Sequence, residues 1–210
     1  MTIAEKTKGI ANFLYEVGML SKTPRSWSSF LGSGEQSVAE HINRTVYIGY
    51  ALGCMRGGTI NTDKIIKMCL FHDLSEARIS DLNYVHQKYT TRKEDVATKD
   101  LVKTLPFGND LQKTIQEYEI RESNEAILAK EADNLEFLIS LKEQVDIGNE
   151  RARTWIPATV KRLKTSEAKE IADSILSTDS DEWWFGDKED KWWVDRNISH
   201  DSFLGSELEK

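Results

Sequence analysis

Apolar residues recur three and four positions apart along most of this chain, and this spacing limits the fold class more than any other feature of the sequence. The clearest case begins at Ser37 and Glu40, which are spaced as a helix capping box. Val38, Ile42 and Val46 then continue one apolar stripe. An alternating apolar–polar pattern, typical of a half-buried strand, nowhere exceeds four residues. The sequence therefore predicts an all-α fold, a single-domain helical bundle.

Further helices are predicted on the same grounds, and their ends follow from capping residues and helix breakers. Thr62 is expected to cap one helix, and Pro157 lies in the first turn of another. The helix that opens with the capping box is expected to end before Gly57, and a polar loop is expected after Asp81. The predicted helices span residues 4–20, 38–56, 62–72, 91–104, 110–120, 123–146 and 157–177.

The size and composition of the chain favour one globular domain with a well-packed core. It has 210 residues, of which 39% are hydrophobic and 30% charged, with only 3 Pro and 12 Gly. A net charge of −7 argues against nucleic acid as the main partner, because duplex binding normally requires a clustered basic surface. No apolar run approaches the roughly 20 residues that cross a bilayer, so no membrane association is expected.

The compartment is predicted from the start of the chain and from its cysteines. The first residues lack a basic segment that leads into an apolar stretch, so a secretory leader is not expected. Cys54 and Cys69 lie in apolar helical patterns, and both are expected to be buried thiols in a reducing environment. We therefore expect a cytoplasmic protein.

The end of the chain differs in composition from the rest. Residues 179–210 are rich in Asp and Glu and contain two tryptophan pairs, Trp183–Trp184 and Trp192–Trp193. Such aromatic pairs are too apolar for a simple solvated tail. We expect residues 1–178 to form the domain and residues 179–210 to form an acidic, Trp-rich extension that packs on the domain or on a dimer interface. A partly disordered appendage is the alternative.

The segment CLFHDLSEARISD is the most informative for function. An apolar helix that buries Cys69 runs into His72 and Asp73, which are followed by Glu76 and Asp81. Glu76 lies four residues after His72, so its carboxylate is expected at the same opening. An imidazole and three carboxylates at the end of a buried helix are costly unless a positive charge compensates them. A divalent metal ion is the simplest compensator.

His41 and Asp133 would complete a coordination set. His41 lies one turn inside the capped helix, and Asp133 lies in the middle of a long helix, where an inward-facing Asp requires a partner. Two imidazoles and two carboxylates would suit Mn, Co, Fe, Mg or Zn. Each residue also has a simpler interpretation: His41 as a structural histidine, Asp133 as a surface charge paired to a lysine, and His72 with its neighbours as a solvated helix end.

The order of these residues resembles the H…HD…D signature of the HD-domain metal-dependent phosphohydrolases, here His41, His72–Asp73 and Asp133. Over residues 10–145 the chain is most similar to the 5′-deoxynucleotidase branch, which has a VAEH segment, an HD-x-x-E-x-x-x-x-D segment and an Arg–Trp pair in the preceding loop. Arg25 and Trp27 resemble that pair, although a serine separates them, and Ser80 stands where Gly is common.

The resemblance implies an enzyme that removes the 5′-phosphate from (deoxy)ribonucleoside monophosphates with a metal-activated water. It implies that Glu76 is the general acid and base, that Arg25 holds the phosphate, and that Asp81 accepts a hydrogen bond from the sugar 3′-hydroxyl. Trp27 would pack on the sugar, and Lys88 is a further candidate for the phosphate. A homodimer is expected from the same resemblance. The metal would be held by His41, His72, Asp73 and Asp133.

Other functions fit parts of the pattern. An HD-type hydrolase of another nucleotide, guanosine tetraphosphate or a nucleoside triphosphate, would use the same ligands. The tetraphosphate enzymes, however, carry a Glu-Asp pair shortly after the HD motif, whereas in this chain Ala77 follows Glu76. An HD-type di-iron oxygenase would need more histidines than the chain offers. A non-catalytic nucleotide- or metal-binding helical module would have no need of Glu76.

Overall fold

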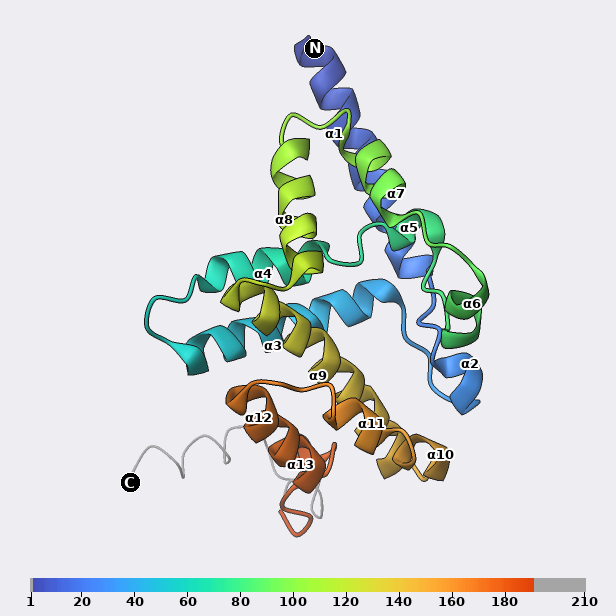
Figure 1. Cartoon of the computed structure of the whole chain (residues 1–210). Coiled ribbons are helices and arrows are strands. Elements are labelled where there is room, and N and C mark those ends of the chain that lie inside the picture. The colour runs from blue at the N-terminus through green and yellow to red at the C-terminus, as the bar shows by residue number, and fades with distance from the viewer. Residues whose placement is uncertain (1, 191–210) are drawn as a thin grey trace, which may run out of the picture. The chain divides into compact units, whose positions relative to one another are not determined.

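The computed structural model describes residues 2–190 of the chain, and all the secondary-structure elements in this range are helices, which confirms the all-α prediction (Figure 1). Pro24 and Ser37 add one isolated β-bridge. None of the described helices is both long and apolar enough to cross a membrane. The chain divides into two compact units at Leu176–Ser177, and each is described by itself.

The first unit is built from long helices joined by short ones. The long helices provide most of the core, and the short ones lie in the connections between them. The elements are α1 (Ile3–Val17), the 3₁₀ helix η1 (Gly18–Lys22), α2 (Ser28–Leu31), α3 (Val38–Arg56), α4 (Thr62–Phe71), α5 (Glu76–Ile79), α6 (Tyr84–Tyr89), α7 (Glu94–Val102), α8 (Gly108–Ile120), α9 (Asn124–Asp146), α10 (Glu150–Arg153), α11 (Ile156–Val160) and α12 (Ser166–Ser177).

Helices α3, α4 and α9 pack on one another and form the centre of the unit. The capping box predicted at the start of α3 is present, since the Ser37 hydroxyl accepts from Glu40 N at 3.2 Å and Glu40 accepts from Ser37 N at 2.7 Å. Gly49 lets α3 approach α4, because a Cβ there would lie 2.6 Å from the sulfur of Cys69. Leu52, Met68 and the leucines of α9 fill the space between the three helices.

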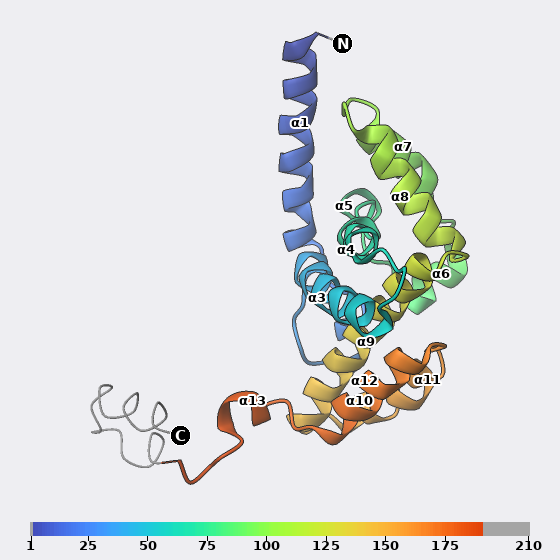
Figure 2. The same ribbon diagram turned by 90° about the vertical axis from the view of Figure 1, so that its left-hand side faces the viewer.

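Two further apolar clusters surround this centre. One joins α1 and η1 to α4, α5, α7 and α8, and Figure 2 shows α4 and α5 between α1 on one side and the α7–α8 pair on the other. The other joins Trp27 and Leu31 to the C-terminal half of α9 and to α10. The second cluster fixes the loop between η1 and α3 against α9, so residues that are distant in sequence meet near the start of α3.

Several element boundaries differ from those predicted, each for a local reason. Asn61, not Thr62, caps α4, and its side chain accepts from Lys64 N at 3.0 Å. The segment after Asp81 is a helix, α6, because the Asn83 side chain accepts from two backbone N–H groups. The first helix ends at Val17 and continues as the 3₁₀ helix η1.

The helix predicted over 157–177 is two helices, α11 and α12, with a break between them. The carboxylate of Glu131 accepts the backbone N–H of Lys164 at 3.0 Å, and this contact replaces a helical hydrogen bond. The prediction of two buried thiols is half wrong: Cys69 is buried, but Cys54 is exposed on α3.

The second unit begins at Ser177, and its described part contains one short helix, α13 (Glu182–Phe185). Trp184 stacks on Phe185 with ring centroids 5.1 Å apart, and Trp183 is exposed. Trp192 and Trp193 lie outside the described residues. The predicted division of the chain at residue 178 and the packing of its acidic extension stay predictions.

Candidate active site

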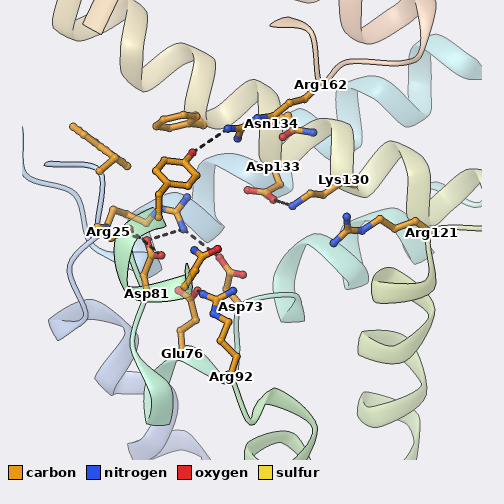
Figure 3. Close-up of a pocket in the computed structure, with 15 residues that line it drawn as sticks. Arg25, Asp73, Glu76, Asp81, Arg92, Arg121, Lys130, Asp133, Asn134 and Arg162 are labelled. Atoms are coloured by element: carbon orange, nitrogen blue, oxygen red, sulfur yellow. Dashed lines mark hydrogen bonds and ion pairs between the residues drawn. The ribbon is translucent and has the colours of Figure 1, made fainter. Parts of the chain in front are cut away.

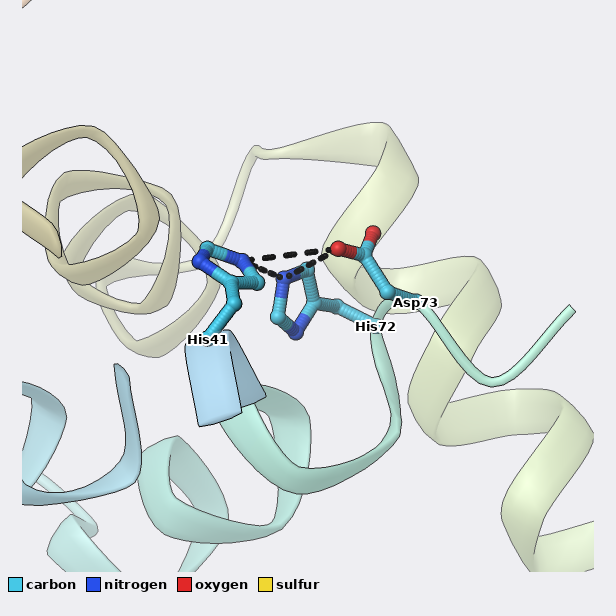
Figure 4. A group of neighbouring side chains, drawn as sticks. All are labelled: His41, His72 and Asp73. Carbon is cyan, nitrogen blue, oxygen red and sulfur yellow. Dashed lines mark hydrogen bonds and ion pairs between the residues drawn. The ribbon is translucent and has the colours of Figure 1, made fainter. Parts of the chain in front are cut away.

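Two histidines from different helices face each other at the centre of the first unit (Figure 4). His41 lies in the first turns of α3, and His72 follows the last residue of α4. Their Nε2 atoms are 3.2 Å apart. Each Nδ1 has its own acceptor, the Glu136 carboxylate at 2.5 Å for His41 and the Cys69 carbonyl at 2.8 Å for His72. In the neutral forms of the rings, both Nε2 lone pairs therefore point into the same space.

Two carboxylates border this space. Asp73 Oδ2 lies 3.4 Å from His41 Nε2 and 3.2 Å from His72 Nε2. Asp133, from the middle of α9, brings Oδ1 to 3.3 Å from His41 Nε2. Its Oδ2 accepts hydrogen bonds from the Tyr118 hydroxyl at 3.2 Å and from Lys130 at 2.6 Å. The four residues expected as metal ligands therefore meet at one place.

The cluster strongly favours a positive charge. Burial and the charge of Arg25 lower the pKa of His41, but its hydrogen bonds to Asp133, Asp73 and Glu136 outweigh them and raise that pKa well above the usual value. Burial would raise the pKa of Asp73, yet the two histidines hold it well below its usual range. For Asp133, Lys130 and His41 likewise outweigh burial and lower the pKa.

The donor atoms also fit the dimensions of a metal site. One ligand atom each from His41, His72 and Asp73 lies within 4.8 Å of the others. Bonds of about 2.1 Å to imidazole and carboxylate ligands place neighbouring ligand atoms about 3 Å apart, close to the separations described above. Two imidazoles with two carboxylates match the ligand types of first-row divalent ions. These residues can thus hold a divalent metal ion.

A buried carboxylate that the sequence did not indicate orients His41. Glu136 is completely buried on α9, three residues after Asp133. Besides the His41 contact, it accepts from Arg44 at 2.8 and 2.9 Å and from Gln36 at 2.6 Å. Burial would raise the pKa of Glu136, but the hydrogen bond to His41 and the charges of His41, Arg44 and Arg25 outweigh burial and lower that pKa to about 2. A carboxylate behind a metal-binding histidine fixes the tautomer and the direction of the ring.

A cavity of about 320 Å³ opens beside the four-residue cluster (Figure 3). Arg25, from the loop before α2, places Nη1 3.4 Å from Asp73 Oδ2 and 3.2 Å from Asp81 Oδ2. Asp81 also accepts from the backbone N–H and the hydroxyl of Ser26 at 3.0 and 3.1 Å. These contacts hold the loop against the segment that follows α5, and they keep a cation beside the carboxylates.

Glu76, in the first turn of α5, has the fewest hydrogen-bond partners of the carboxylates described in this site. Its Oε2 is buried without a hydrogen-bond partner, and its Oε1 lies 3.5 Å from Nη2 of Arg92. Burial and the charges of Asp73 and Asp81 raise the pKa of Glu76 to about 9, against the opposing effect of Arg25 and Arg92. At neutral pH this carboxyl group holds a proton and faces the cavity.

The family is decided by a comparison with models of known families. The HD domain model matches residues 17–175, which is most of the chain. The chain belongs to the HD domain family. Similar proteins of that family include the mouse 5′-deoxynucleotidase HDDC2, 29% identical over 177 residues that cover 80% of this chain and 86% of the mouse protein. The human 5′-deoxynucleotidase HDDC2 is 26% identical over 178 residues, covering 80% of this chain and 85% of that protein.

Solved structures give the same fold. A conserved hypothetical protein from Pyrococcus furiosus superposes with a TM-score of 0.69 at 25% identity and covers 80% of this HD domain chain and 99% of its own. The cyanophage S-2L HD phosphohydrolase DatZ, bound to dA and one catalytic Zn²⁺ ion, superposes with a TM-score of 0.51 at 19% identity and covers 78% of this chain and 96% of its own. At that identity the likeness shows the fold alone.

Of the other two residues predicted for this HD domain site, Trp27 lines the cavity and Lys88 does not. Trp27 is buried and lines the cavity, and its Nε1 donates to Gln36 at 3.3 Å. Lys88 does not line the cavity, because it is exposed on α6, where its Nζ lies 5.6 Å from the centre of the Tyr89 ring. Sequence reasoning also missed Arg92, whose Nε is buried without a partner at the cavity wall. The sequence predicts a loop that runs into a helix for this segment. The place of Arg92 in the site becomes clear only from its tertiary contact with Glu76.

Proposed function

We propose that this chain is a metal-dependent phosphohydrolase that removes the 5′-phosphate from (deoxy)ribonucleoside monophosphates. The observation that carries this proposal is the position of Glu76, a carboxyl group with a buried, unpartnered oxygen, at the cavity that borders a possible metal site of His41, His72 and Asp73. Asp133, which contacts His41, borders the same cavity. A binding module would not require an acid at this point. The relatives named 5′-deoxynucleotidases support the same substrate class.

The ligands in this proposal are His41, His72, Asp73 and Asp133. A divalent ion bound there would neutralise phosphate oxygens and lower the pKa of a water molecule toward neutrality. Glu76 would then act as the general acid. The sugar alkoxide is a poor leaving group, so a proton must reach O5′ as the phosphorus–oxygen bond breaks. Burial, the largest cause of the raised pKa of Glu76, favours the protonated form that a general acid requires.

Two guanidinium groups would bind the phosphate. The Nε atoms of Arg25 and Arg92 are buried and lack hydrogen-bond partners, and both side chains line the cavity. An unpaired buried N–H is costly, and a phosphate oxygen would satisfy each of them. A fork of N–H donors also fixes the direction of the phosphate, which a lysine would not do. Arg92 thus takes the role for which the sequence offered Lys88.

The nucleoside would lie against Trp27 and Asp81. Asp81 is fixed by Ser26 and Arg25, and a carboxylate has room for one more donor, which the sugar 3′-hydroxyl would supply. Trp27 offers an apolar surface for the sugar, and its indole is held in place by Gln36. A bulky ring at this point favours a sugar without a 2′-hydroxyl, so deoxyribonucleotides are the expected preferred substrates.

Phosphate release from a panel of ribo- and deoxyribonucleoside monophosphates tests this proposal. The purified full chain would be assayed with Mn²⁺, Co²⁺, Mg²⁺ and Zn²⁺ supplied separately and with a chelator as the blank. Metal-dependent release of inorganic phosphate is expected, with the deoxy substrates preferred. Metal binding without release from any monophosphate would overturn the proposal and favour a non-catalytic module.

We also propose a homodimer, as the resemblance implies, and a cytoplasmic location, as the start of the chain and the cysteines predict. Large apolar side chains are exposed on two helices, Leu14 and Tyr15 on α1 and Tyr47 and Tyr50 on α3. Such surfaces suit contact with a second copy. The molar mass in solution, measured by light scattering after size exclusion, would be twice 24.0 kDa for a dimer.

A further inference from the structure

The side chain of Gln36 bridges the sugar side and the metal side of the site. Its Oε1 accepts a hydrogen bond from Nε1 of Trp27 at 3.3 Å, and its Nε2 donates to Oε1 of Glu136 at 2.6 Å. The other oxygen of Glu136 lies 2.5 Å from Nδ1 of His41. A single amide group thus connects the indole proposed to pack on the sugar with the carboxylate that orients a metal-binding histidine.

The chemistry of the two partners fixes the orientation of this amide. The indole N–H of Trp27 is only a donor and requires an oxygen opposite it, whereas the carboxylate of Glu136 is only an acceptor and requires an N–H. With the amide turned over, two donors would face each other at one end and two acceptors at the other. Of glutamine, glutamate and methionine, which are similar in length, only glutamine serves both neighbours.

The backbone of Gln36 is fixed independently of its side chain. Its carbonyl oxygen accepts the N–H of Arg25 at 2.7 Å. On the other side of the isolated β-bridge, the N–H of Val38 donates to the carbonyl oxygen of Thr23 at 2.9 Å. These bonds hold the start of the loop against the segment before α3. A substitution of the Gln36 side chain leaves them in place, so it can remove the two side-chain contacts without releasing the loop.

Packing alone does not fix the indole of Trp27. The ring belongs to the apolar cluster that includes Leu31 and Phe137. It lines two hollows, however: the cavity of the site and a separate hollow of about 320 Å³ that Gly34 and Arg44 also line. The hydrogen bond from Nε1 therefore sets which way the flat ring faces the cavity.

From these contacts we propose that Gln36 is a positioning residue with two tasks: it sets the face that Trp27 presents to the sugar, and it holds Glu136 behind His41. The inference rests on the proposed function, because it needs the sugar at Trp27 and a metal ion at His41. Gln36 does not line the cavity of the site, so it acts through its neighbours. One substitution should therefore weaken both the preference for a deoxy sugar and the binding of the metal.

Gln36→Met in the full chain is the test variant, because methionine keeps the length of the side chain and removes both hydrogen bonds. Arg44 and Ser140 still donate to Glu136, so metal affinity, measured by competition with a chromophoric chelator, should fall by only about three- to tenfold. The preference for a deoxynucleoside monophosphate over its ribonucleotide counterpart, measured as a ratio of kcat/KM values, should fall by roughly fivefold, the usual contribution of one hydrogen bond.

Gln144→Met is the matched control. Gln144, near the end of α9, accepts from the hydroxyl of Ser33 at 2.6 Å, so it also holds the loop before α3. That hydrogen bond involves neither Trp27 nor Glu136. The control should keep the metal affinity and the sugar preference of the wild type. Equal losses in the two glutamine variants would mean that Gln36 only stabilises the loop, and would overturn the inference.

Two double variants separate the two tasks. In a Trp27→Phe background the indole N–H is absent, so Gln36→Met should no longer change the sugar preference but should still lower metal affinity. In a Glu136→Gln background its effect on metal affinity should shrink, while its effect on the sugar preference stays. Effects of Gln36→Met that persist in full in both backgrounds would contradict the two tasks.

The two readouts also separate this inference from the proposed function. Competition with a chelator needs no turnover, so an unchanged metal affinity in Gln36→Met would overturn the inference whatever the enzyme hydrolyses. An unchanged sugar preference in that variant would overturn it as well. A wild-type chain that binds the metal but releases phosphate from no monophosphate would instead count against the proposed function.

Discussion

The floor and the rim of the site are built in different ways. The floor consists of the expected metal ligands, His41, His72, Asp73 and Asp133, with Glu136 beside His41. These residues come from the long helices α3 and α9 and from the end of α4, and the two histidines and Glu136 are buried. The rim, Arg25, Glu76 and Arg92, comes from short helices and the loops between them. Floor residues are fixed by several packed neighbours at once, whereas the rim guanidiniums rest on a few ion pairs.

This difference separates two tasks. A metal site requires ligand atoms held to a few tenths of an ångström, which the packing of long helices provides. A substrate that must enter and leave requires groups that can lose one set of contacts and gain another, and the orphaned N–H groups of Arg25 and Arg92 suit that purpose. Changes in the floor should therefore weaken or abolish binding of the metal, and changes in the rim should affect catalysis while the metal stays bound.

The largest effect is expected from Asp73→Ala, because this carboxylate contacts both histidines of the floor. Without it the cluster loses a ligand and a negative charge, so metal content and turnover should fall together, turnover by about a thousandfold or more. Metal content by elemental analysis and phosphate release measure the two losses. Asp110→Ala, an exposed aspartate paired with Lys67, is the control. An Asp73→Ala protein with full metal-dependent activity would contradict the ligand assignment.

Glu76→Gln should separate the rim from the floor. The metal should still bind, but turnover should fall by about 10² to 10⁴, the usual contribution of a general acid. Glu94→Gln is a matched control, since Glu94 also binds Arg92, at 2.9 Å, without lining the cavity. Loss of metal in the Glu76 variant, or turnover within a few-fold of the wild type, would contradict the assignment of metal binding to the floor and of acid catalysis to the rim.

The same variant tests the raised pKa of Glu76. In the folded, metal-free protein the carboxyl group keeps its proton up to about pH 9, whereas in the unfolded chain it ionises near 4.5. The unfolded state therefore binds fewer protons between these values, and the free energy of unfolding of the wild type should fall as the pH rises. Glu76→Gln lacks this contribution, so its stability relative to the wild type should increase from pH 5 to 9 in urea titrations.

Glu136→Gln should weaken the floor without removing a ligand. The substitution keeps the shape of the side chain but removes the charge that orients His41, and such changes typically lower metal affinity by about 10- to 100-fold. Glu143→Gln, on the same helix and also paired with Arg44 at 2.5 Å, is the control, because it does not contact His41. Competition with a chromophoric chelator measures the affinity. Equal affinities in the two variants would mean that Glu136 only anchors Arg44.

The sequence predicted the floor better than the rim. His41, His72 and Asp133 were expected as ligands because of their order along the chain and the family resemblance that this order carries, although each alone also allowed a simpler interpretation. Glu136 was not predicted, because a glutamate in an apolar run of a helix gives no sign of whether an arginine from another helix will compensate it. Its contact with Arg44 joins residues 92 positions apart in sequence.

The rim depends on tertiary contacts that leave little trace in the sequence. Lys88 follows Asp81 closely in sequence, but the Asn83 cap folds its segment into α6 and leaves Lys88 exposed. Arg92 reaches the cavity because the chain turns back after that helix. Predicted helix boundaries were wrong for the same reason. At Lys164, for example, the carboxylate of Glu131 from α9 interrupts the expected helix.

The smallest effect is expected from Ser80→Gly, which tests whether the rim carries backbone strain. Ser80 follows α5 and precedes Asp81, and it adopts φ 64° and ψ 164°, a conformation populated almost only by glycine. Glycine should relieve this strain and raise the free energy of unfolding by about 1 kcal/mol, although part of the gain is offset by the greater freedom of glycine in the unfolded chain. Urea denaturation measures the gain, and Ser174→Gly, within helix α12, should destabilise the protein instead. Since the strained residue only sets the direction of Asp81, metal affinity should not change. A stabilised variant whose KM also rises would show that the strain serves to aim Asp81 at the substrate.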